Sequence, residues 1–101
     1  MVEYKIIFSK FADKDKKLLK QAGLEEKTLN LLDMISENPY QTPPTYEKLK
    51  GNLDGLLSRR ISLQHRLVYK VYEKEKEIFI VRMWSHYDKT KQWFLSFFLL
   101  L

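Results

Sequence analysis

The sequence predicts a single α+β domain, in which an N-terminal strand and a helical hairpin pack on a small antiparallel sheet. Apolar residues recur with a helical period from about residue 10 to residue 35, and from residue 60 onward they alternate with polar ones. The chain has 101 residues, which is enough for one hydrophobic core and too few for two. The expected order of elements is strand, helix, helix, strand, strand, strand.

The N-terminal third is predicted to form a strand and two helices. Residues 4–8 are apolar and partly β-branched, and Ser9 is a suitable N-cap for the helix that follows. Gly23 can end this first helix and begin the turn to the second, which stops at Asn38 before a proline. The apolar face of the first helix is expected to contain Phe11, Leu18, Leu19 and Ala22. That of the second contains Leu24, Thr28, Leu31, Leu32 and Ile35.

The C-terminal half is predicted to be β-structure. After a turn-rich connector at residues 41–45, odd positions from 61 to 71 are mostly apolar and even positions mostly polar. The pattern alone leaves open whether a turn near residues 63–65 interrupts this alternation. Residues 73–76 form a polar turn, and residues 77–84 read as a further strand.

The C-terminal segment differs in composition from the rest of the chain. Eight of the nine residues from 93 to 101 are apolar, far fewer than the roughly 20 that a membrane-spanning helix needs. We therefore expect a domain at residues 1–88 and an apolar extension at 89–101, which caps the core, mediates self-association or is a non-native addition. The absence of cysteine and of a secretory signal favours the cytoplasm.

The net charge of +5 is concentrated in the middle of the chain. Residues 43–72 carry two acidic residues, Glu47 and Asp54, against six basic ones: Lys48, Lys50, Arg59, Arg60, Arg66 and Lys70. Arginine offers a planar fork that matches phosphate. This local excess indicates either a nucleic-acid site or a solvated surface, and charge alone does not separate the two.

The same segment contains groups suited to cutting RNA. RNA is cleaved by its own 2′-hydroxyl when a base takes the proton, cations hold the phosphorane charge and an acid protonates the leaving 5′-oxygen; no metal is required. Glu47 is the candidate base, Arg66 and Arg60 are candidate charge stabilisers, and His86 is the candidate acid. The alternative for Glu47 is a solvated carboxylate in a Lys-rich loop.

Other residues of this region are expected to be structural. Arg59 and Arg60 are adjacent in a predicted strand and so point to opposite faces, which leaves Arg59 to pair with an acidic helix residue. His65 occupies an odd position, like the apolar residues of its segment, and is expected to be a hydrogen-bonded structural histidine. Tyr87 either stacks on a base or covers the sheet edge. Two histidines about twenty residues apart make a weak set of metal ligands.

The motifs of this region resemble those of a known family. They are Glu47-x-Leu49-Lys50-x-Asn52-Leu53-x-Gly55, Ser58-Arg59-Arg60-Ile61, His65-Arg66-Leu67-Val68-Tyr69 and His86-Tyr87. With them the chain resembles a Txe/YoeB-type toxin of the RelE/ParE superfamily, the toxic halves of bacterial toxin–antitoxin pairs, and the helical hairpin before them fits a RelE-like layout. Members usually end at or just after the His-Tyr pair, whereas this chain continues to residue 101.

The resemblance implies an endoribonuclease without cofactor that enters the 70S ribosome A site and cleaves mRNA during translation. It also implies a cognate antitoxin protein, and operator DNA bound only through the antitoxin complex. By position, Glu47 corresponds to the general base, Arg66 to the phosphate-stabilising arginine and His86 to the general acid. Lys50, Arg60 and Tyr87 are the substrate-binding candidates.

A non-catalytic RelE/ParE-fold toxin or binding protein that acts on a protein target is the alternative. The joint presence of Glu47, Arg66 and His86 favours the enzyme, because a protein that only binds has no need of a matched base and acid.

Overall fold

The computed structural model describes residues 3–86, and for residues 85 and 86 it describes the backbone. This part of the chain forms eight elements in the order β1 (Lys5–Phe8), α1 (Lys10–Gln21), α2 (Glu25–Glu37), β2 (Tyr46–Lys48), the 3₁₀ helix η1 (Gly51–Leu53), β3 (Leu57–Arg60), β4 (His65–Tyr72) and β5 (Glu77–His86). Tyr87 and the expected extension at 89–101 lie outside the described residues.

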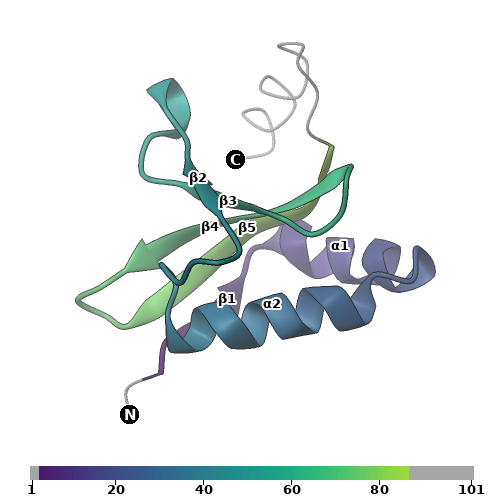
Figure 1. Ribbon diagram of the computed structural model, residues 1–101, viewed down its shortest axis with the longest axis horizontal. Helices are drawn as coiled ribbons and strands as arrows, with labels where there is room; N and C mark the ends of the chain where they lie inside the picture. Colours follow the sequence, from purple (N-terminus) through teal and green to yellow (C-terminus); the bar gives the residue numbers. More distant parts are fainter. Residues whose placement is uncertain (1–2, 87–101) are drawn as a thin grey trace.

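The described strands form one mixed sheet in the order β1-β5-β4-β3-β2. β1 runs parallel to β5, and the other neighbouring pairs are antiparallel. β1 therefore lies at one edge of the sheet, beside β5. The two helices connect it to β2 at the other edge. Both helices lie on one face of the sheet (Figure 1). The predicted α+β fold with a helical hairpin is confirmed.

The helix boundaries follow the predicted signals, but the buried face of α1 does not. Ser9 Oγ accepts a hydrogen bond from the Ala12 N–H at 3.0 Å, and Gly23 has the positive φ of 73° that the turn requires. The buried residues of α2 are Thr28, Leu32 and Ile35, which all belong to its predicted apolar face. Those of α1 are Ala12, Asp15 and Leu19.

The predicted face of α1 is therefore wrong at two positions, since Leu18 and Ala22 are exposed. A hydrophobic pattern could not find the buried face, because one of its three residues is the carboxylate Asp15, whose partners lie in β5.

A turn does interrupt the alternation between residues 61 and 71. β3 ends at Arg60 and β4 begins at His65, and Leu63 at the turn between them is 87% exposed although its parity predicted burial. Residues 66–69 of β4 are buried on both faces. The larger core, with Leu67 and Tyr69, lies under the helices, and a smaller cluster of Leu53, Val68 and Val81 covers the opposite face.

The segment around Glu47 was expected to be a loop and instead forms β2, a three-residue edge strand paired with β3. Pairing with β3 fixes the direction of its side chains, which a loop would not do. Within residues 3–86, no helix is long and apolar enough to cross a membrane.

Candidate active site

Three neighbouring strands bring the candidate base and two arginines to one face of the sheet. Glu47 of β2 lies opposite Ser58 of β3, and Arg60 of β3 lies opposite Arg66 of β4. Directly opposed residues point to the same face, and Ser58 and Arg60 share a face because they are two residues apart. This is the face away from α1 and α2, so the helices leave it accessible.

Arg66 is held in a fixed position at the centre of this group. Its Nε donates to Ser58 Oγ at 2.6 Å and its Nη2 donates to Glu47 Oε1 at 2.9 Å. The Arg66 side chain is 7% exposed, whereas that of Glu47 is 57% exposed. A substrate can therefore reach the carboxylate, while the guanidinium next to it is oriented by the sheet.

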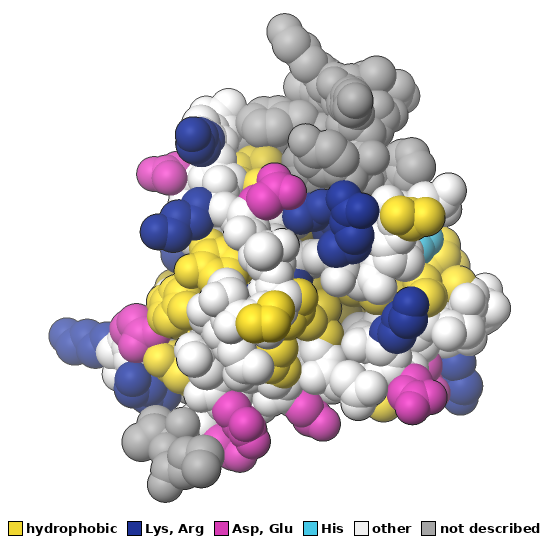
Figure 2. Space-filling view, in the orientation of Figure 1, with side chains coloured by type: hydrophobic (Ala, Val, Ile, Leu, Met, Phe, Trp, Pro, Cys, Tyr) yellow, Lys and Arg dark blue, Asp and Glu magenta, His cyan; other side chains and the backbone are white. Residues whose placement is uncertain are grey.

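Glu47 and Arg66 line a cavity of about 380 Å³ together with Arg60 and with Pro44 and Thr45 of the connector. Figure 2 shows basic side chains grouped beside an acidic one over the β2 and β3 part of the sheet. A carboxylate that shares a cavity with two guanidinium groups is an arrangement that can bind a phosphodiester and accept a proton beside it.

Arg59 points to the other face and anchors the connector that precedes β2. It is fully buried, and its guanidinium donates to Tyr69 Oη at 2.8 Å and to the carbonyl oxygens of Pro44, Gln41 and Pro39 at 2.6, 2.8 and 3.0 Å. The Tyr69 hydroxyl donates to the Pro39 carbonyl at 2.8 Å. Burial raises the pKa of Tyr69 above its ordinary value, although the Arg59 hydrogen bond opposes the shift.

The structural role predicted for Arg59 is thus confirmed, but its expected partner is wrong. Backbone carbonyls and a tyrosine hydroxyl take the place of an acidic helix residue. This anchoring fixes the segment that leads into Glu47.

The other predicted residues are described to different extents. Lys50 is exposed just before η1 and is not part of the cavity lining. The backbone of His86 ends β5, with its Cα paired to that of His65. The His65 ring stacks on Trp84 with 3.8 Å between ring centroids, which fits the structural role predicted for it. Tyr87 lies beyond the described residues.

Two residues that hold this site were not singled out from the sequence. Ser58 belongs to the Ser-Arg-Arg-Ile motif, and the β3–β4 register places it opposite Val68 and so diagonal to Arg66 on the same face. Tyr69 belongs to the His-Arg-Leu-Val-Tyr motif, but its bond to Arg59 depends on the same register. Within residues 3–86, no three His, Asp or Glu side chains converge as a metal site would require.

Known proteins resemble this chain in both sequence and fold. The family described as "YoeB-like toxin of bacterial type II toxin-antitoxin system" matches residues 7–87. A curated relative, the toxin YoeB of Synechocystis sp., is 37% identical over 79 residues, which are 78% of this chain and 83% of the relative.

Two solved structures are similar over most of their length. The YoeB-YefM complex from Staphylococcus aureus contains a chain with 38% identity and a TM-score of 0.70, and the match covers 83% of this chain and 98% of that one. The YoeB/ParE toxin from Agrobacterium tumefaciens has 27% identity and a TM-score of 0.74, with 82% and 99% of the two chains covered.

Proposed function

The chain belongs to the YoeB-like toxins of bacterial type II toxin–antitoxin systems, and on this premise we propose that it is a ribosome-dependent mRNA endoribonuclease that needs no metal. The observation that carries the proposal is the cavity in which Glu47 and Arg66 are joined at 2.9 Å with Arg60 beside them.

In the proposed reaction the RNA supplies its own nucleophile. Glu47 takes the proton of the 2′-hydroxyl, and the 2′-oxygen attacks the adjacent phosphorus. The bond from phosphorus to the 5′-oxygen breaks, leaving a 2′,3′-cyclic phosphate, and His86 gives a proton to the departing 5′-oxygen. Arg66 donates to the phosphorane oxygens as their negative charge grows.

The other substrate-binding residues act on the RNA around the scissile phosphate. Arg60 contacts a phosphate from the cavity wall, and Lys50 does so from the exposed segment that follows β2. Tyr87 follows the proposed acid and supports the position of the substrate.

A ribosome is required because the catalytic groups do not orient RNA by themselves. One positioned acid or base contributes about 10²- to 10⁴-fold, and a fixed substrate geometry supplies much more. We propose that the ribosomal A site holds the mRNA in that geometry.

The proposed protein partner is a cognate antitoxin. The YoeB-YefM assembly from Staphylococcus aureus is a toxin–antitoxin complex. By analogy with that complex, we propose that an antitoxin binds this chain. We further propose that the antitoxin inhibits it and that the complex of the two binds operator DNA in the cytoplasm.

The test is a translating bacterial extract to which the purified chain is added. New mRNA 5′ ends are expected within A-site codons, and Glu47→Gln or His86→Ala should reduce their rate of formation by about 10²- to 10⁴-fold. Asp54→Asn is the matched control, because it removes an exposed carboxylate of the same segment that does not line the cavity.

Three outcomes distinguish the possible functions. Cleavage that needs ribosomes and leaves a 2′,3′-cyclic phosphate end supports the proposal. Equal cleavage of naked RNA would remove the ribosome from it. Intact messages under conditions where the chain still arrests bacterial growth would overturn it in favour of a protein target.

A further inference from the structure

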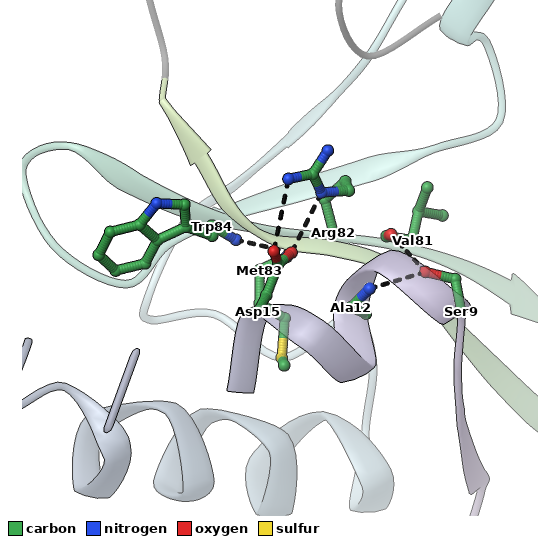
Figure 3. Close-up of polar contacts among 7 residues, drawn as sticks. All are labelled: Ser9, Ala12, Asp15, Val81, Arg82, Met83 and Trp84. Atoms are coloured by element: carbon green, nitrogen blue, oxygen red, sulfur yellow. Dashed lines mark hydrogen bonds and ion pairs between the residues drawn. The ribbon is translucent and has the colours of Figure 1, made fainter. Parts of the chain in front are cut away.

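Where β1 ends, the start of helix α1 takes its place against the edge of β5. β1 pairs with β5 as far as Phe8 opposite Ile80, and in the described chain no strand covers this edge of β5 beyond that point. Ser9 N–H donates to the Ile80 carbonyl at 2.9 Å, and Ser9 Oγ donates to the Val81 carbonyl at 2.7 Å. The N-terminal turn of α1 therefore binds the backbone of β5 where β1 stops (Figure 3).

β5 is out of regular register with β4 at two places, and the second, just beyond these contacts, is a bulge. Val68 of β4 lies opposite Arg82, and Arg66 lies opposite Ser85, so Met83 and Trp84 together face Leu67. In a regular strand, successive N–H groups point to opposite edges, and a bulge breaks that alternation. Here the N–H groups of Met83 and Trp84 both donate to Asp15 Oδ2, at 2.9 and 3.1 Å.

Asp15 is suited to fixing this backbone because it is itself fixed. Its carboxylate is 2% exposed and also accepts from Arg82, with Nε at 3.1 Å from Oδ2 and Nη2 at 3.4 Å from Oδ1. Figure 3 shows the carboxylate of α1 directed at the three successive residues of β5. A single buried carboxylate thus ties α1 to the bulge through charge-assisted hydrogen bonds.

The bulge immediately precedes the end of β5, which carries the proposed acid. After it, Ser85 pairs with Arg66 and His86 pairs with His65. A shift of one residue in a strand moves every following side chain to the other face, and bulges are a known means of re-aiming a side chain. We propose that Asp15 is a positioning residue, whose carboxylate holds the β5 bulge and so sets the register of the strand end that carries His86. This inference rests on the proposed function, in which His86 is the general acid.

The test compares two leaving groups in ribosome-bound mRNA. One message carries the normal 5′-oxygen at the scissile phosphate, and the other carries a bridging sulfur, which leaves without protonation because thiols have a pKa of about 8.5. Asp15→Ala is expected to slow cleavage of the oxygen message about 10- to 100-fold at saturation, part of the 10²- to 10⁴-fold that an acid contributes. Cleavage of the sulfur message should stay within about threefold of wild type, as for His86→Ala.

Two further variants keep the test decisive. Asp15→Asn retains an oxygen for the two amides and guards against a failure of Asp15→Ala to fold; its smaller loss should also disappear with the sulfur message. Asp13→Ala is the matched control, since Asp13 is an exposed aspartate of the same helix that pairs with Lys16. A folded Asp15→Asn that loses the same rate on both messages would overturn the inference.

The register of β5 gives a readout that does not depend on cleavage. In the full-length protein, NMR cross-strand contacts between Arg66 and Ser85 and between His65 and His86 should weaken in Asp15→Ala or Asp15→Asn and persist in Asp13→Ala. Their persistence in both Asp15 variants would also overturn the inference. A wild-type chain that leaves messages intact would instead refute the proposed function, and these NMR contacts would then decide the role of Asp15 alone.

Discussion

Arg59 and Arg60 are neighbours in β3 and have opposite surroundings. Arg59 is fully buried, and its donors go to three carbonyl oxygens and the Tyr69 hydroxyl. Arg60 is exposed on the other face, at the cavity of Glu47. The sequence predicts this division from strand alternation alone, whereas the partners of Arg59 depend on where the connector folds.

Replacement of each arginine by methionine should separate stability from activity. Arg59→Met removes a buried guanidinium that donates to three carbonyl oxygens and to Tyr69, and it is expected to lower the free energy of unfolding by about 3–5 kcal/mol. Arg60→Met should change it by less than about 0.5 kcal/mol, while weakening substrate binding. Urea unfolding followed by circular dichroism, together with cleavage rates, measures both effects. Equal destabilisation by the two variants would refute this division of roles.

At the scale of elements, long periodic segments were predictable and short ones were not. α1 has the N-cap Ser9, α2 has apolar residues at helical spacing, and β4 and β5 have long apolar stretches. β2 has three residues and no periodic pattern of its own, so it forms only because β3 offers it a partner. The buried face of α1 was mispredicted for a similar reason, because the partners that bury Asp15 lie in a distant strand.

The connector between α2 and β2 makes a pH-dependent contribution to stability. The Tyr69 hydroxyl donates to Pro39 and accepts from Arg59, and burial raises its pKa above the ordinary value of 10.0. Since the folded-state pKa is the higher one, this contribution is fully present below about pH 10 and is lost as the pH rises through the folded-state pKa.

Tyr69→Phe should therefore destabilise the protein by about 1–3 kcal/mol at neutral pH, and by progressively less above pH 10. Denaturant unfolding of both proteins at a series of pH values gives the difference in free energy. Tyr72→Phe, an exposed position of the same strand, is the matched control and should cost less than about 0.5 kcal/mol at neutral pH. A difference that stays constant or grows above pH 10 would contradict the assignment.

Across the whole molecule, the helices and the candidate site occupy opposite faces of one sheet. The predicted base and arginines do meet, because Glu47, Arg60 and Arg66 line one cavity. The sequence motifs indicated which residues would lie together. The distances between these residues depend on how β2, β3 and β4 pair, which no single motif specifies. Ser58 was missed for that reason. The roles of His86 and Tyr87 stay predictions for the experiments above.

The domain boundary expected at residue 88 makes a prediction for the molecule as a whole. The buried apolar residues of the described chain run from Ala12 to Met83, and the family match ends at residue 87. A chain that stops at Asp88 should therefore keep its core and fold cooperatively, with a thermal midpoint close to that of the full chain.

Its rate of mRNA cleavage should equal or exceed that of the full chain, since the apolar segment at 89–101 supplies none of the proposed catalytic groups. Calorimetry, light scattering and the extract assay on both chains measure folding, association and activity. A broad or absent thermal transition in the shortened chain would show that residues 89–101 belong to the core.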